Sequence, residues 1–189
     1  MLAHHQSRLL NAAELARSLA VDGKTIANYL DLMVDLLLVR RLAPLHRNVS
    51  KRLIKSPKVY VRDSGLVHAL LGLETRDAVL GHPVAGGSWE GFVIETLINV
   101  APDGTVASFY RTSAGAEIDL VLELPGGALW AIEVKRGLIP KVERGFHNAC
   151  EDLDPKRRFV VYSGSERYAL GNKIEAISLF ELAAYLTKQ

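Results

Sequence analysis

Apolar side chains from Asn11 to Leu37 recur at spacings of three and four, which is typical of amphipathic helices. Asn11 and Glu14 form a capping-box pattern at the start of the first helix. Asp22 can cap a second helix, after Val21-Asp-Gly23 interrupts the first. Val39–Leu42 and the β-leaning residues up to Val61 follow. The pattern predicts two helices and then a pair of strands.

In the second half of the chain, segments with the helical spacing of apolar residues alternate with segments that have the two-residue spacing of strands. The expected elements, in order, are a helix over 88–100 capped by Ser88, strands over 106–111, 117–124 and 128–135, a helix over 142–153, a strand over 158–163, and a helix over 178–186 capped by Ser178. Short connections between the first three strands favour a meander. This order predicts an α/β (mixed α+β) domain whose central mixed β-sheet is flanked by helices.

A stretch rich in Gly, Pro and small residues, Glu74–Gly87, reads as a linker or surface loop. It predicts two domains, 1–80 and 81–189. Charge divides the same way, with 11 Lys and Arg against 4 Asp and Glu from Arg8 to Arg62, and 12 against 17 beyond. A basic module can contact phosphate and clustered acids can hold a cation, although both can equally be solvated faces.

Composition narrows the class of protein. The 189 residues are 49% apolar and 23% charged, which suits an ordinary folded domain. Cys150 is the single cysteine, so neither a disulfide framework nor a thiolate zinc cluster is expected. Apolar runs fall far short of the roughly 20 residues that cross a bilayer, and the first residues lack a signal-peptide pattern. We therefore expect a cytoplasmic protein with no membrane partner.

Candidate chemistry lies on two of the predicted strands. Glu133 and Lys135 point to one side of their strand because side chains alternate with a period of two. Asp119 shares a face with Glu117 and Val121 on the preceding strand, opposite Ile118, Leu120 and Leu122. If the strands are neighbours, Asp119 lies near Glu133, and paired carboxylates repel unless a cation or a proton intervenes. Mg²⁺ is the expected cofactor because it prefers carboxylate oxygens and retains waters.

The preceding helix offers a third carboxylate. Glu90 lies in register with Val93, Ile94 and Leu97 at offsets of three, four and seven, on or beside the buried stripe. Acidic side chains seldom face a core without a partner. Glu90 is therefore a candidate third acid beside Asp119 and Glu133, with Glu95 as the second choice on the helix.

Two known families share these features. Ala13–Ala16, Lys24–Leu30 and Leu38–Leu42 resemble a winged helix-turn-helix, whose second helix enters the major groove. Glu90, Asp119 and then Glu133-Val134-Lys135, on a helix, three strands, a helix and a strand, resemble the PD-(D/E)XK nucleases, which include type II restriction enzymes and Holliday-junction resolvases. Ile118-Asp119 stands where that superfamily has Pro-Asp.

Most of the chain also resembles the C-terminal half of a bacterial and archaeal group of AAA-type ATPases. There a winged helix and a nuclease-like domain of unknown function follow a P-loop ATPase. The likeness lies in Lys58–Leu66, Trp89–Glu95, Tyr110–Thr112, Glu117–Leu120 and Ala131–Lys135. A Gly-x-x-x-x-Gly-Lys-[Ser/Thr] loop is absent, so we expect no nucleotide site in this chain and a separated C-terminal part of such a protein.

The resemblance implies Mg²⁺-dependent hydrolysis of DNA phosphodiesters. Asp119, Glu133 and the Val134 carbonyl would bind the metal, Glu90 would complete the shell or orient a water, and Lys135 would position or deprotonate the attacking water. The expected nucleic-acid contacts are Lys24, Thr25, Asn28, Arg47, Lys51, Arg52 and Arg111, with Tyr110 and Thr112 also on the substrate side. The alternative is a non-catalytic DNA- or protein-binding module serving an AAA-type ATPase domain of the same polypeptide or of a separate chain. The sequence leaves the oligomeric state open, a homo-oligomer included.

Overall fold

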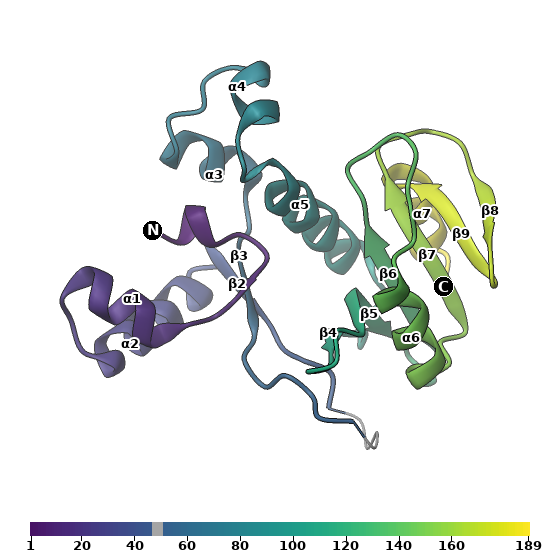
Figure 1. Cartoon of the computed structure of the whole chain (residues 1–189), viewed down its shortest axis with the longest axis horizontal. Helices are drawn as coiled ribbons and strands as arrows, with labels where there is room; N and C mark the ends of the chain where they lie inside the picture. The colour runs from purple at the N-terminus through teal and green to yellow at the C-terminus, as the bar shows by residue number, and fades with distance from the viewer. Residues whose placement is uncertain (47–50) are drawn as a thin grey trace. The chain divides into compact units, whose positions relative to one another are not determined.

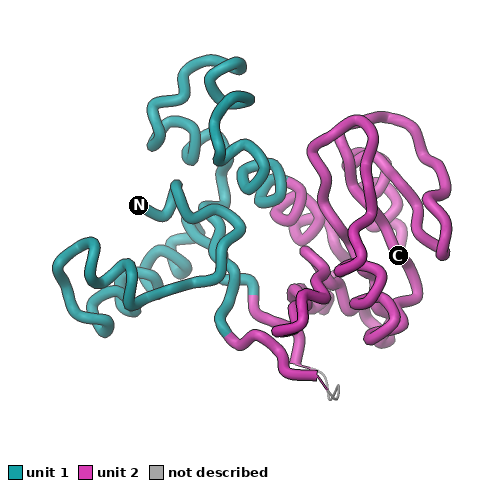
Figure 2. The backbone as a smooth tube through the Cα atoms, viewed as in Figure 1, with its two compact units in different colours: residues 1–42, 56–92 teal, residues 43–55, 93–189 magenta. Residues whose placement is uncertain are grey.

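The computed structural model describes residues 1–46 and 51–189, which form helices and two β-sheets (Figure 1). Two compact units divide the chain. The first comprises Met1–Leu42 and Ser56–Phe92, and the second comprises Ala43–Lys55 and Val93–Gln189 (Figure 2). The sequence placed the boundary near residue 80. Among the described residues, no helix is both long and apolar enough to span a membrane.

The first unit contains the predicted helices and strand pair. Its elements are η1 (Leu2–His5), β1 (Arg8–Leu9), α1 (Ala12–Leu19), α2 (Gly23–Asp35), β2 (Val39–Leu42), β3 (Lys58–Val61), α3 (Ser64–Leu70) and α4 (Arg76–Gly81). Both predicted caps form: Asn11 Oδ1 accepts from the Glu14 N–H at 3.1 Å, and Asp22 Oδ1 accepts from the Thr25 N–H at 2.7 Å. β3 pairs antiparallel with β1 on one side and β2 on the other.

The expected linker over Glu74–Gly87 is wrong in part, because it contains α4 and the start of α5 (Ala85–Val100). The predicted helix therefore begins before Ser88, which is buried within it rather than capping it, with Oγ 2.9 Å from His68 Nε2. Small residues here allow close packing. A Cβ at Gly91 would lie 3.1 Å from the Tyr60 ring. Glycine has a low helix propensity, so the local sequence did not predict the first turn of α5.

The second unit is built on a mixed six-stranded sheet, counted over the described residues. Its strands are β4 (Val106–Arg111), β5 (Glu117–Glu123), β6 (Leu129–Val134), β7 (Arg157–Tyr162), β8 (Tyr168–Gly171) and β9 (Ile174–Ser178), in the order β4-β5-β6-β7-β9-β8. β4, β5 and β6 form the predicted antiparallel meander. β6, β7 and β9 are parallel. The predicted order of elements is confirmed; β8 and β9 are additional.

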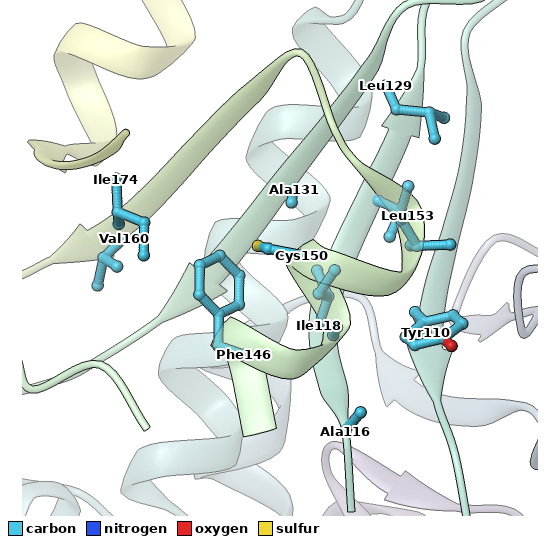
Figure 3. Packing of buried hydrophobic residues seen from close by; sticks show 12 residues of the cluster. Tyr110, Ala116, Ile118, Leu129, Ala131, Phe146, Cys150, Leu153, Val160 and Ile174 are labelled. Atoms are coloured by element: carbon cyan, nitrogen blue, oxygen red, sulfur yellow. The ribbon is translucent and has the colours of Figure 1, made fainter. Parts of the chain in front are cut away.

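Helices cover the sheet as the sequence predicted. α6 (Arg144–Leu153) connects β6 to β7 and packs its buried side chains on the face that carries Ile118, Ala131 and Val160 (Figure 3). α7 (Leu179–Leu186) is capped by Ser178, whose Oγ accepts from the Glu181 N–H. Its Tyr185 stacks on Trp130, with ring centroids 5.2 Å apart.

An additional segment pairs with the β4 edge of this sheet. The Phe109 N–H donates to the Ala43 carbonyl at 3.0 Å, and the Leu45 N–H donates back to the Phe109 carbonyl at 2.7 Å. Farther along, the Ile54 N–H donates to the Arg111 carbonyl at 3.0 Å. Most of the connection between β2 and β3 thus belongs to the second unit, and it provides hydrogen-bond partners for backbone groups of β4.

Candidate active site

The site begins at an irregularity in β5. Ser108 pairs with Val121 but Tyr110 pairs with Ile118, so two steps along β4 match three along β5. This extra residue is a β-bulge, which changes the direction of the side chains around it. Ile118 and Val121 consequently both pack under α6, whereas the sequence placed them on opposite faces.

Asp119 lies within this bulge and is 8% exposed. Its Oδ2 accepts a hydrogen bond of 3.0 Å from the backbone N–H of Val134, at the end of the adjacent strand β6. A backbone amide therefore fixes the carboxylate beside the Glu-x-Lys segment. The predicted proximity of Asp119 and Glu133 is present, because the regular β5–β6 register, continued by one residue beyond Leu120 and Ile132, sets the two acids opposite each other.

Glu133 and Lys135 follow the regular alternation of β6 as predicted. Glu133 is 7% exposed, and its Oε1 lies 3.0 Å from Lys135 Nζ. The same ammonium lies 3.0 Å from Glu143 Oε1, just before α6. The Lys135 N–H donates to the Val161 carbonyl at 2.8 Å, which holds this end of β6 against β7.

The pKa values reflect this crowding. Burial raises the pKa of Glu133 to about 8, the Asp119 carboxylate adds to the rise, and Lys135 opposes it. Burial lowers the pKa of Lys135, but Glu133 and Glu143 outweigh it and raise the pKa above its ordinary value. At neutral pH Lys135 is therefore an ammonium ion, and the buried Glu133 carboxyl group releases its proton less readily than an exposed glutamate does.

These residues fit a divalent cation bound through two carboxylates. Asp119 and Glu133 are buried and close enough to repel one another, and a cation relieves that repulsion. Mg²⁺ commonly binds through one or two carboxylates and takes its remaining ligands from water and substrate phosphate. Over residues 1–46 and 51–189, no group of three or more His, Cys, Asp or Glu side chains is placed to hold a metal.

Glu90, the third predicted ligand, lies in the first unit. Its Oε1 accepts from the Tyr60 hydroxyl at 2.7 Å and lies 3.2 Å from Nζ of the buried Lys58. Its role at the metal stays a prediction. Glu95, the second choice, is buried in the part of α5 that belongs to the second unit. α5 carries apolar residues on most of its faces, so the spacing of apolar residues did not show which of the two acids lies on the buried face.

The predicted nucleic-acid contacts are distributed over both units. Lys24 and Asn28 are exposed on α2 and Thr25 is half-buried there. Arg47 lies outside the described residues. Lys51 and Arg52 belong to the second unit, where Lys51 Nζ lies 2.5 Å from Asp152 Oδ1. Their contact with nucleic acid stays a prediction.

The residues predicted to face substrate around β4 separate into two kinds. Arg111 is partly exposed, with Nε 3.4 Å from Glu117 Oε2. Tyr110 and Thr112 are buried, which corrects their expected place beside substrate. The Tyr110 hydroxyl donates to Asp152 Oδ2 at 2.9 Å, and Thr112 Oγ1 accepts from the Ala116 N–H at 3.1 Å.

Glu143 was missed by sequence reasoning. It contacts Lys135 from the far end of the connection between β6 and α6. Nothing in the local pattern singles out an acid eight residues beyond the lysine. The Pro at 140, which interrupts both helix and strand, was the available signal that the chain turns back here.

Comparison with known proteins places the chain in a family. Two uncharacterized proteins, Mb2031c of Mycobacterium bovis and Rv2008c of Mycobacterium tuberculosis, are each 42% identical to it over 177 residues. The match covers 94% of this chain but 40% of each relative, so the chain spans well under half of their length. No solved structure matches.

Two family models match successive stretches of the chain. Residues 1–77 match a domain of unknown function, DUF8612. Residues 85–182, more than half of the chain, match a second domain of unknown function, DUF4143. The helix, the meander, α6 and the strands that carry Asp119, Glu133 and Lys135 all lie within the second match. The chain therefore belongs to the DUF4143 family.

Proposed function

We propose that the second unit is a PD-(D/E)XK nuclease-like module that hydrolyses DNA phosphodiesters with a divalent cation. The observation that carries the proposal is the buried Asp119–Glu133 pair with the Lys135 ammonium 3.0 Å from Glu133. The surrounding fold supports it, because a helix, an antiparallel meander, a crossover helix and a parallel strand succeed one another as in that superfamily.

Each residue has a defined part in this proposal. Asp119 and Glu133 hold the cation, with the Val134 carbonyl beside them. A bound Mg²⁺ supplies Lewis-acid stabilisation of the phosphate and lowers the pKa of a coordinated water. In the metal-free chain, Glu133 and Glu143 raise the pKa of Lys135 and so favour its ammonium form. We therefore assign it to stabilising negative charge in the transition state rather than to deprotonating water.

The test is a cleavage assay on plasmid and branched DNA with Mg²⁺ or Mn²⁺. Asp119→Asn and Lys135→Ala should each lower the rate by about a hundredfold or more, as the loss of a transition-state contact does. Asp103→Asn and Lys173→Ala are matched controls because both residues are exposed in loops of the same unit. DNA that stays intact across both metals, with folded protein, would overturn the proposal.

Metal binding gives a second readout that does not need turnover. Mn²⁺ should raise the Tm of the protein, and a chelator should reverse the rise, because a ligand that binds only the folded state stabilises it. Asp119→Asn should abolish the shift. A shift that survives this substitution would place the cation elsewhere.

A second candidate function concerns the first unit, as a protein-docking module. α2 exposes Tyr29 and Leu32, its C-cap residue Leu36 is also exposed, and the helix carries Lys24 against Asp31 and Asp35. An apolar, slightly acidic helix suits a protein surface better than a phosphate backbone. An AAA-type ATPase domain, as in the proteins that the sequence resembles, is the partner we propose.

The two interpretations of α2 differ in their DNA titrations. If α2 docks protein, Lys24→Ala and Asn28→Ala should leave DNA affinity within about twofold of the parent, because neither side chain meets a phosphate. A tenfold loss in either variant would instead assign α2 to DNA.

A further inference from the structure

The connection between β6 and α6 carries an unusual exposed tip. Residues 136–142 leave β6 just after Lys135 and return at Glu143. At the tip Leu138 is 72% exposed and Ile139 is 83% exposed. Isolated exposed aliphatic residues are common on protein surfaces. Two adjacent ones at the tip of a loop beside a candidate active site call for a functional explanation.

The base of this loop is held at several points. The Lys135–Glu143 ion pair, at 3.0 Å, joins its two ends. The Ser163 hydroxyl donates to the Arg136 carbonyl, and Pro140 is buried on the return side. The exposed tip is therefore presented by a fixed base.

Basic residues flank the apolar tip. Arg136, Lys141 and Arg144 are exposed, and Glu143 is the single acid from Lys135 to Arg144. Cationic side chains on both sides of an apolar pair match the surface of a nucleic acid, where phosphates flank stacked bases. A polar protein surface would not desolvate the pair, and two aliphatic side chains provide little area for insertion into a membrane.

We propose that this loop is a DNA wedge, in which Leu138 and Ile139 press between stacked bases while Arg136, Lys141 and Arg144 contact the adjacent phosphates. This inference rests on the proposed function, because it assumes the same DNA substrate. The wedge follows Lys135 directly in the chain, so base unstacking occurs next to the scissile phosphodiester.

The wedge also specifies the class of substrate. Unstacking a base step costs a few kcal/mol in regular duplex DNA and less where stacking is already weakened. The protein therefore selects mismatched, branched or kinked DNA over regular duplex. Selection comes from deformability of the step rather than from base identity.

The experiment uses the full chain and a duplex that carries 2-aminopurine beside a mismatch, with Ca²⁺ in place of Mg²⁺ to allow binding without cleavage. Binding of the parent protein should raise 2-aminopurine fluorescence, because unstacking relieves its quenching. The double variant Leu138→Ser, Ile139→Ser should lose about four-fifths or more of that rise, since serine cannot replace an apolar wedge.

Val106→Ser is the matched control. Val106 is an exposed aliphatic residue in the same unit, and it pairs with Glu123, which pairs with Leu129 at the start of β6. It therefore lies at the opposite end of the meander from Lys135, and its substitution should leave the fluorescence unchanged. Hydrolysis of a small aryl phosphodiester by the double variant should also be unchanged, because the metal site stays intact.

Three results would overturn the wedge. The double variant could give the parental fluorescence rise, the parent could give none on binding DNA, or the parent could fail to bind DNA. Loss of binding to anionic vesicles alone in the double variant would reassign the tip to a membrane. Normal cleavage with an unaffected double variant removes only the wedge, whereas cleavage that survives Asp119→Asn removes the proposed active site.

Discussion

At the scale of single residues, Glu133 is the group of the candidate site whose ionisation is most unfavourable. Its carboxyl group is buried near Asp119, and these surroundings raise its pKa to about 8, against 4.5 for an unperturbed glutamate. A group with this shift binds a proton in the folded chain at a pH where the unfolded chain has already released it. Protonation and cation binding are thus two alternative ways of neutralising the same position.

This shift predicts a pH-dependent stability in the presence of a chelator. The stabilisation is complete below about pH 4.5 and is lost as pH rises toward 8, with a slope on the order of 1 kcal/mol per pH unit in the free energy of unfolding. Glu133→Gln removes the titrating group and should remove this slope. Urea denaturation at half-unit steps of pH measures it.

Glu143→Gln is the control for this prediction. Glu143 contacts the same ammonium group, but its side chain is mostly exposed, and exposed ion pairs contribute little. The pH slope should therefore persist in this variant. A parental slope in Glu133→Gln would show that another group is responsible.

At the scale of elements, sequence reasoning succeeded where the strand is regular. The alternation of β6 placed Glu133 and Lys135 on one side, and the structure agrees. On β5 the same alternation placed Asp119 near Glu133, which agrees with the regular β5–β6 register, but it placed Ile118 on the wrong face because the bulge arises in the pairing with β4. An extra residue in one strand leaves no mark on that strand's own hydrophobic pattern.

Other elements were missed because their signals are non-local. β8 is largely exposed at the edge of the sheet, so it lacks the apolar alternation that identifies a half-buried strand. The first turn of α5 is rich in glycine and depends on packing rather than propensity. The fold class and three of the site residues could be predicted, whereas the ion-pair partner Glu143 and the insertion along β4 required the three-dimensional structure.

The start of α6 provides a prediction at this scale. A Cβ on Gly145 would lie 2.6 Å from the backbone carbonyl oxygen of Gly115, just before β5. Gly145→Ala should therefore push α6 away from β5 and lower the free energy of unfolding by about 1–3 kcal/mol, as overpacking does. Thermal and urea denaturation give the measurement.

A glycine with open space provides the comparison. Gly86 lies in α5, and a Cβ there would meet nothing within 4 Å. Gly86→Ala should be neutral or slightly stabilising because alanine favours the helix. Equal destabilisation by the two substitutions would contradict the close approach of Gly145 to Gly115.

At the scale of the whole molecule, two separate stretches of the chain, 43–55 and 93–189, form the second unit. Ala43, Leu45 and Ile54 form backbone hydrogen bonds with β4, and Lys51 adds its ion pair with Asp152. A fragment of residues 81–189 should therefore have a lower Tm and should self-associate, because the loss of this segment exposes the β4 edge. Differential scanning fluorimetry and light scattering measure both effects.

A synthetic peptide of residues 43–55, added to the fragment, should restore the Tm and the monomer, whereas a scrambled peptide should not. A monomeric fragment with an unchanged melting curve after addition of either peptide would show that the segment is dispensable. The comparison isolates the contribution of the paired segment from that of the rest of the first unit.

The assembly of each unit from two stretches of the chain also limits which recombined genes can encode a complete unit. A genetic exchange with one crossover point between positions 43 and 92 cannot transfer either unit whole, because each is assembled from two stretches of the chain. New combinations that separate them begin with an incomplete sheet. The similarity to the two mycobacterial proteins runs through both units, over 177 residues.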